Sequence, residues 1–136
     1  MSDIKCAFIV QRAQFKGETS RLALTHALAY QTVEVLLDDG DTVTPSLCFV
    51  GEGVLGVNKG QKAMEMYGLN SSELHVKNCL LVDMDIYMCK EDLERYGISP
   101  DDIPDADDMG AEKHINIVPF AEIEKLMEEA KHVLFF

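Results

Sequence analysis

The sequence predicts an α/β protein: a three-layer α/β/α sandwich built on a mostly parallel, five-stranded sheet. Two observations support this class. Short apolar runs that suit buried strands alternate with segments whose apolar residues recur at the helical period. The chain of 136 residues is long enough to bury a substantial core, and it contains no internal repeat or boundary to a second domain. We therefore expect a single domain over residues 1–136, with helices on both faces of the sheet.

The strands are predicted from compact apolar runs. Residues 4–10 are almost continuously apolar, as a buried parallel strand requires. Residues 42–50 form the second strand, and Pro45 is expected to mark its frayed start, because proline cannot donate a hydrogen bond inside a central strand. The remaining predicted strands are residues 86–89, 114–118 and 133–136.

The helices are predicted from periodicity and from residues typical of helix ends. Residues 18–37 carry a largely apolar stripe, and Gly40 follows as a C-cap. Residues 71–83 are ambiguous, since Ser71 suits a helix N-cap whereas Leu80 to Val82 would also suit a strand; the helix is preferred. The other predicted helices are residues 60–67, residues 90–96 ended by Gly97, and a helix opened by Pro119 that runs to about residue 131.

Two loops invite ligand-binding interpretations that fail on spacing. Residues 51–56 match G-x-G-x-x-G, but they follow the second strand instead of the first, and Glu52 would place a carboxylate beside a pyrophosphate. A tight turn is the better interpretation. The acidic loop 99–113 does not form an EF-hand, because Asn116 stands where the terminal glutamate is required. The four histidines are dispersed along the chain, so we predict neither a cofactor nor a metal site.

The charge balance narrows the classes of partner. The net charge is −12, with 24 acidic residues against 12 basic ones, which disfavours direct nucleic-acid binding and attachment to anionic membranes. No apolar run approaches the roughly 20 residues that cross a bilayer. The first residues also lack the basic and apolar regions of a signal peptide, so we expect a cytoplasmic protein.

The four cysteines are expected to be free thiols. No C-x-x-C pair is present, which removes the usual zinc and thioredoxin patterns. Cys6 and Cys48 lie within apolar strand runs and are interpreted as small buried hydrophobes, and Cys79 resembles them but is ambiguous.

Cys89 differs from the other thiols because it stands at the end of a predicted strand, just before a helix. Carboxyl ends of strands are where α/β proteins place ligands and catalytic groups, and the positive end of the helix dipole favours a thiolate. Lys90 would lower the pKa of this thiol, whereas Glu91, Asp92 and Glu94 would oppose that effect. Cys89 is the candidate catalytic residue.

The order of these segments resembles the DsrE/DsrF-like superfamily, and most closely its DsrF/TusC branch. The resemblance covers nearly the whole chain. It is carried by the opening strand 5–10, the run Phe49-Val-Gly-Glu-Gly-Val54 followed by Gly60-Gln61, Cys89 followed by Leu93 and Tyr96-Gly97-Ile98, and the closing residues 131–136. Two departures are Tyr96, where the family has arginine, and the longer acidic loop.

This resemblance implies a function in sulfur relay. Members pass persulfide sulfur between cysteines, for tRNA thiolation or dissimilatory sulfur metabolism, and Cys89 matches the position of the relay cysteine. The implied partners are copies of the same chain, or DsrE/TusD-like and DsrH/TusB-like subunits, with a DsrC/TusE-like sulfur acceptor. In such hetero-oligomers the essential cysteine belongs to the DsrE/TusD-like subunit. The alternative is therefore a non-catalytic assembly or small-molecule-binding subunit with no sulfur transfer of its own.

Overall fold

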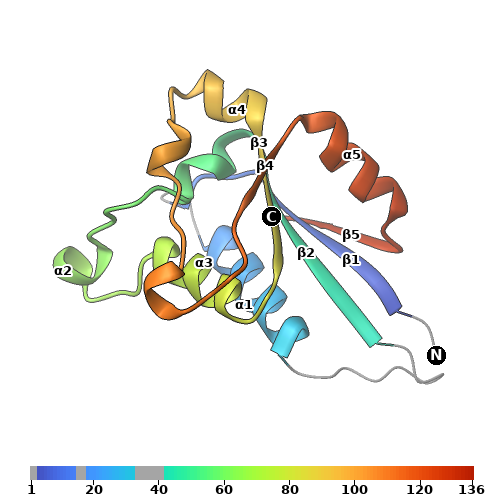
Figure 1. The fold of residues 1–136 in the computed structure, drawn as a ribbon, viewed down its shortest axis with the longest axis horizontal. Coiled ribbons are helices and arrows are strands. Elements are labelled where there is room, and N and C mark those ends of the chain that lie inside the picture. The colour runs from blue at the N-terminus through green and yellow to red at the C-terminus, as the bar shows by residue number, and fades with distance from the viewer. Residues whose placement is uncertain (1–2, 15–17, 33–41) are drawn as a thin grey trace.

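Five parallel strands form one sheet in the computed structural model, which describes residues 3–14, 18–32 and 42–136 (Figure 1). The strand order is β4-β3-β2-β1-β5, and all four pairings are parallel. The strands are β1 (Asp3–Val10), β2 (Thr42–Phe49), β3 (Asp85–Cys89), β4 (Asn116–Val118) and β5 (His132–Phe135). The predicted five-stranded α/β fold is confirmed.

Helices cover both faces of this sheet. The helices are α1 (Thr19–Thr32), α2 (Ala63–Tyr67), α3 (Ser72–Leu81), α4 (Lys90–Arg95) and α5 (Phe120–Glu129). From β1 to β4 each strand is added on the same side, so right-handed crossovers place α1 and α3 on one face. The chain then returns to the other side of β1, which places α5 on the opposite face (Figure 1).

The core is divided in the same way. A large apolar cluster fills the face under α1 and α3, with Phe8, Leu47 and Met88 among its fully buried residues. A smaller cluster lies under α5; its buried members are Ala7, Ile9, Cys48, Cys89 and Ile123. The candidate thiol therefore belongs to the thinner of the two layers, in which α5 is the one helix among the described residues that packs on the sheet.

Three local predictions need correction. Pro45 does not lie in a frayed start: it pairs in register with Cys6 of β1. It is tolerated because β3 begins to pair with β2 only at Ser46, so the β3 side of β2 is still open there. The strand predicted from residue 114 is shorter, since β4 begins at Asn116. Residues 51–56 form a 3-10 helix, η2 (Gly51–Gly56), where a plain turn was expected.

The helix predicted over residues 60–67 also begins later, with α2 at Ala63, and the other boundaries that can be compared agree to within two residues. The ambiguous stretch is helical as preferred, and the Ser71 hydroxyl caps α3 by accepting a hydrogen bond from the Leu74 N–H at 3.1 Å. The first helix is described to Thr32, and its predicted continuation to Leu37 and Gly40 lies outside the described residues.

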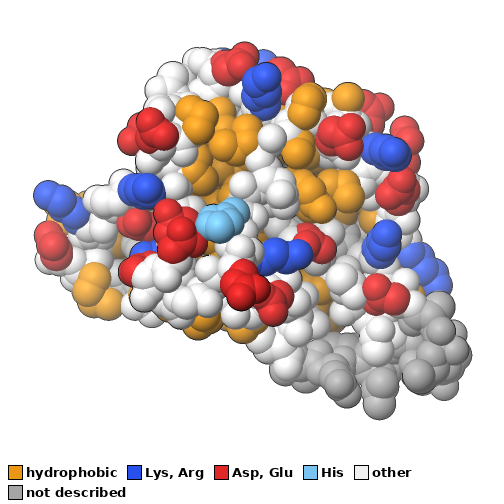
Figure 2. Space-filling view, viewed as in Figure 1, with side chains coloured by type: hydrophobic (Ala, Val, Ile, Leu, Met, Phe, Trp, Pro, Cys, Tyr) orange, Lys and Arg blue, Asp and Glu red, His pale blue; other side chains and the backbone are white. Residues whose placement is uncertain are grey.

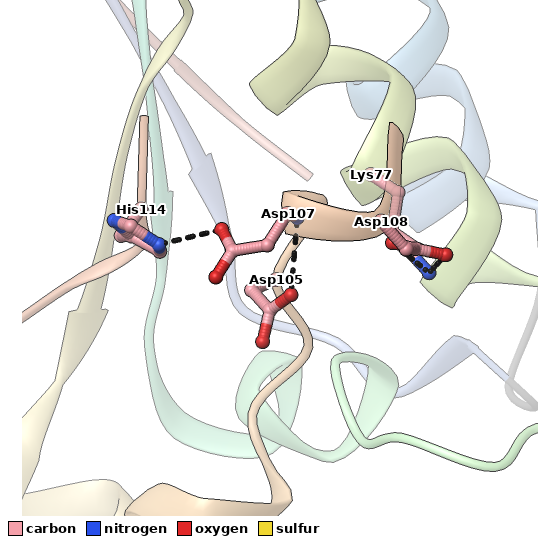
Figure 3. A network of polar contacts seen from close by, with 5 residues as sticks. All are labelled: Lys77, Asp105, Asp107, Asp108 and His114. Carbon is pink, nitrogen blue, oxygen red and sulfur yellow. Dashed lines mark hydrogen bonds and ion pairs between the residues drawn. The ribbon is translucent and has the colours of Figure 1, made fainter. Parts of the chain in front are cut away.

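A network of polar contacts fixes the acidic loop 99–113 to the body of the protein (Figure 3). Lys77 of α3 lies 3.2 Å from Asp108, and His114 Nε2 lies 2.8 Å from Asp107. The Asp105 carboxylate accepts a hydrogen bond from the Asp107 N–H at 3.1 Å. Within the described ranges, no three His, Cys, Asp or Glu side chains gather as they would around a metal ion. Asp108 therefore anchors the loop to α3, while Asp105 and Asp107 fix its local conformation.

Gly53 is required by a close approach between η2 and the end of β1. A Cβ atom at this position would lie 2.1 Å from the Val10 carbonyl oxygen, which is backbone and cannot turn away. At Gly56, by contrast, the nearest atom to such a Cβ is 3.8 Å away, in the Gln14 side chain. The glycine spacing that resembles a nucleotide-binding motif thus has a packing cause at its second position.

We expect Gly53→Ala to lower the free energy of unfolding by about 3 kcal/mol, because the backbone must shift to admit the methyl group. Gly56→Ala is the matched control and should stay within about 1 kcal/mol of the parent. Guanidinium denaturation of both variants measures the difference. Equal stabilities would contradict the proposed close packing of η2 on β1.

The described part of the chain contains no helix that is long and apolar enough to cross a bilayer.

Candidate functional site

Cys89 lies where two neighbouring connections leave the sheet toward opposite faces. It is the last residue of β3, and it pairs directly with Val118, the last residue of β4. After β3 the chain enters α4, whose Leu93 packs in the cluster under α1 and α3. After β4 it enters α5, whose Ile123 packs on the other face. Ligand-binding crevices of open α/β sheets form at such a switch point, outside the carboxyl ends of the strands.

Asp92 ties the first turn of α4 to the connection that follows β2. Its carboxylate oxygen Oδ2 accepts a hydrogen bond from the Gly51 N–H at 2.6 Å, and Oδ1 lies 3.4 Å from Arg95 Nη1. Asp92 is only 7% exposed, so the bond is sheltered from water. Gly51 adopts a φ of +53°, a left-handed conformation that glycine allows and that turns its N–H toward the carboxylate.

Glu91 ties the same turn to the connection that follows β4. The Phe120 N–H donates to both Glu91 carboxylate oxygens, at 3.0 and 3.1 Å. Phe120 is the first residue of α5, and the N-cap position is Pro119, which offers no side-chain hydrogen bond. Glu91 therefore supplies the cap that the sequence of α5 lacks, and its negative charge is favourable at a helix N-terminus.

These two contacts hold a pair of valines beside the thiol. Val118 is its partner on β4, and Val50 follows Phe49, the residue that pairs with Met88 on β2. Both valines pack against the apolar cluster that contains Cys89. Gly51 comes directly after Val50, so the Asp92 hydrogen bond fixes the position of Val50. Glu91 holds Phe120, which follows Val118 and Pro119, and so fixes the position of Val118. The two loop segments that carry these valines are called the cover of Cys89. Cys89 itself is only 1% exposed, in the cluster to which Ile123 of α5 also belongs.

The environment keeps the Cys89 thiol protonated. Burial is the largest cause that raises its pKa, the backbone N–H of Asp92 lowers it, and the Asp92 and Glu91 carboxylates raise it; the result is a pKa of about 11. The start of α4 favours the thiolate as predicted, through the Asp92 N–H, but this effect is outweighed by burial and by the two carboxylates. The net preference for the thiolate that we expected is therefore not found, and α4 is only six residues long.

The acids after Cys89 also have a role that sequence reasoning missed. The sequence predicts that these charges are unfavourable to the thiolate, and that effect on the pKa of Cys89 is confirmed for Asp92 and Glu91. Both are also acceptors for backbone N–H groups of other loops. An acidic residue in the first turn of a helix often accepts a hydrogen bond from a backbone N–H group, but the sequence does not show which loop supplies that N–H group.

The remaining thiols are buried, as predicted for Cys6 and Cys48. All four cysteines are free. Burial raises the pKa of Cys48 and of Cys79 to about 12 and also raises that of Cys6. Cys48 shares the cluster of Cys89, whereas Cys6 and Cys79 lie on the other face of the sheet. Cys89 alone is both the last residue of its strand and adjacent to the switch point.

A cavity of about 340 Å³ lies elsewhere, where α2 and the beginnings of α1 and α3 meet. Its lining includes Arg21, Tyr67 and Ser71, and no residue that surrounds Cys89 takes part in it. The structure thus does not bring the candidate thiol and this cavity together.

Residues 5–136 match the sequence model of the DsrE/DsrF-like family, so the chain belongs to that family. The ychN protein from E. coli has the same fold, with a TM-score of 0.72 at 17% identity over 98% of this chain and 99% of that one. A protein of unknown function from Methanobacterium thermoautotrophicum gives 0.60 at 13% identity, covering 98% and 100% of the two chains. One from Bacteroides thetaiotaomicron gives 0.58 at 11%, covering 96% and 94%. No curated protein sequence matches this chain.

In the isolated native protein, we expect Cys89 to titrate with a pKa of about 11, against an ordinary thiol value of 9.0. The folded state then holds this proton more tightly than the unfolded state, so the free energy of unfolding should fall as the pH rises from about 9 toward 11. The pH dependence of iodoacetamide alkylation, followed on the Cys89 peptide by mass spectrometry, measures the pKa. A value below the ordinary one would show that the described environment is wrong.

Proposed function

We propose that this protein is a sulfur carrier in which Cys89 accepts a sulfane sulfur as a persulfide and passes it to a partner thiol. The observation that carries the proposal is the place of Cys89 at the switch point of a DsrE/DsrF-like fold. Cys6 and Cys48 lie within strands and Cys79 lies within a helix, so none of them is the last residue of its element.

The reaction requires no external oxidant. The Cys89 thiolate attacks the terminal sulfur of a donor persulfide, forming a new S–S bond as the S–S bond of the donor breaks. The electron pair of the broken bond leaves on the donor sulfur, which takes up the proton that Cys89 has lost. Attack by an acceptor thiolate on the terminal sulfur of Cys89–S–SH then repeats the exchange and regenerates the Cys89 thiol.

The burial and the raised pKa of Cys89 are the properties of a resting form of the protein, in which the thiol does not react. A thiol that is protonated and covered is protected from oxidation and from unspecific alkylation. Sulfur transfer then requires a partner that uncovers Cys89 and favours its thiolate. A relay in which the cysteine is exposed only in a complex fits these properties.

The surface offers apolar area for such partners. Several large apolar side chains are more than half exposed: Met64, Met66, Tyr67 and Phe135. Figure 2 shows further hydrophobic side chains in groups between charged ones, in the part of this face near α4 and α5. We propose assembly with copies of the same chain or with DsrE/TusD-like and DsrH/TusB-like subunits, as in the DsrF/TusC branch. A DsrC/TusE-like protein would accept the sulfur, in a cytoplasmic setting that keeps thiols reduced.

The burial of Cys89 also favours a second candidate function, that of a non-catalytic assembly subunit. In that case the thiol is a packed core group, and the subunit completes a site on a partner that carries its own cysteine. The two functions differ in whether sulfur ever resides on Cys89.

Incubation with a small persulfide donor, followed by intact-mass measurement, separates them. The sulfur-carrier function predicts a gain of one sulfur atom in the parent, alone or in complex with its partner subunits, its loss in Cys89→Ser, and its retention in Cys79→Ser, the control for a buried thiol on the opposite face of the sheet. The measurement is repeated with the protein purified together with any subunits that it binds. Absence of the added sulfur in both forms, or its persistence in Cys89→Ser, would exclude Cys89 as the carrier.

A further inference from the structure

We infer that Glu91 is a positioning residue that gates access to Cys89, by holding the start of α5 closed over the thiol. The inference rests on the proposed function, in which a sulfur donor must reach a cysteine that is 1% exposed. Of the two connections beside the thiol, the one after β4, which Glu91 holds, is the one that opens.

The Asp92 side of the cover is the firmer one. The Asp92 carboxylate is buried, and Arg95 braces it from the same helix. The turn that it holds continues into η2, whose Val54 is fully buried in the large cluster. Release of this side would therefore leave a buried carboxylate without its hydrogen bond and would pull core residues apart.

The Glu91 side is built from weaker parts. Glu91 is exposed, and so is Phe120, at 40%, so water can replace their hydrogen bond at little cost. β4 is a three-residue strand at the edge of the sheet. In α5 only Ile123 is fully buried, and the first turn has no other cap. This junction can therefore open while the rest of the sheet stays folded.

Opening at the junction between β4 and α5 would expose the thiol at the carboxyl ends of β3 and β4, where the sulfur donor is expected to bind. Val118, the direct neighbour of Cys89 in the sheet, is separated from Phe120 by Pro119 alone, so displacement of Phe120 moves the valine that lies beside Cys89. The crevice between the carboxyl ends of β3 and β4 would then be free for a donor persulfide. Glu91 sets the position of this cover and makes no contact with the reacting sulfur in the proposed step.

Four proteins test the gate: the parent, Glu91→Ala, Glu91→Gln and Glu94→Ala. The glutamine keeps an oxygen that can accept the Phe120 N–H but removes the charge. Glu94→Ala removes an exposed acid of the same helix, whose side chain makes none of the hydrogen bonds or ion pairs found among the described residues. Each protein is alkylated with iodoacetamide at neutral pH, and Cys89 and Cys79 are quantified separately by peptide mass spectrometry.

Cys79 serves as an internal reference, because it is a fully buried residue of α3 and we expect it to react only when the protein unfolds globally. We expect the ratio of the Cys89 rate to the Cys79 rate to rise about fivefold in Glu91→Ala, the effect of one lost helix cap on an opening equilibrium. Glu91→Gln and Glu94→Ala should stay within about twofold of the parent.

A ratio in Glu91→Ala equal to that in Glu94→Ala would overturn the gate, and so would an equal rise of the Cys89 and Cys79 rates, which indicates global destabilisation. A rise in Glu91→Gln as large as in Glu91→Ala would also overturn it, since charge instead of the hydrogen bond would then be responsible. The experiment uses no sulfur donor, so failure of the gate and failure of persulfide formation are separate results.

Discussion

The first turn of α4 belongs to the connection after β3 and holds the connections after β2 and β4 in place. In a parallel sheet the carboxyl ends of all strands meet at one edge, and each loop that leaves this edge must satisfy its own backbone N–H groups. Here two adjacent acids of α4 accept N–H groups from the connections after β2 and β4, at Gly51 and Phe120. The position of η2, the start of α5 and the cover over Cys89 all depend on these two contacts.

The same contacts explain why the thiol combines a functional place with an inert environment. Residues at a switch point are available to ligands only if nothing closes the crevice. In this chain Val50 and Val118 pack against the cluster that contains Cys89, and the carboxylates that hold their loops also add negative charge beside the sulfur. A reactive thiolate thus requires a change in the surroundings of Cys89, and the structure offers one side of the cover that can move without disturbing the large core.

Much of the fold could be predicted from the sequence, because alternation of buried strands and amphipathic helices is a local pattern. The sheet of five strands, the helix after Ser71 and the family resemblance all follow from such patterns. The ends of elements were less predictable, since they depend on neighbouring strands. Pro45 is tolerated inside β2 because β3 begins to pair with β2 only at the next residue, Ser46. The place of Cys89 at a strand end was also predicted correctly.

The chemistry of the site could not be predicted in the same way. The dipole argument for a thiolate considers α4 alone, whereas burial under α5 and two acids determine the pKa of Cys89. The partners of Glu91 and Asp92 lie 29 and 41 residues away along the chain, and no spacing rule connects them. Only the three-dimensional arrangement shows that these acids are structural acceptors as well as unfavourable charges.

Native-state hydrogen exchange at the Gly51 and Phe120 amides tests most directly whether the first turn of α4 holds both loops. We expect both amides to be protected from exchange in the parent, and the protection to be stronger at Gly51 because Asp92 is buried. Asp92→Ala should remove protection at Gly51 and leave Phe120 protected, and Glu91→Ala should do the reverse. Exchange of both amides at unprotected rates in the parent would contradict the account.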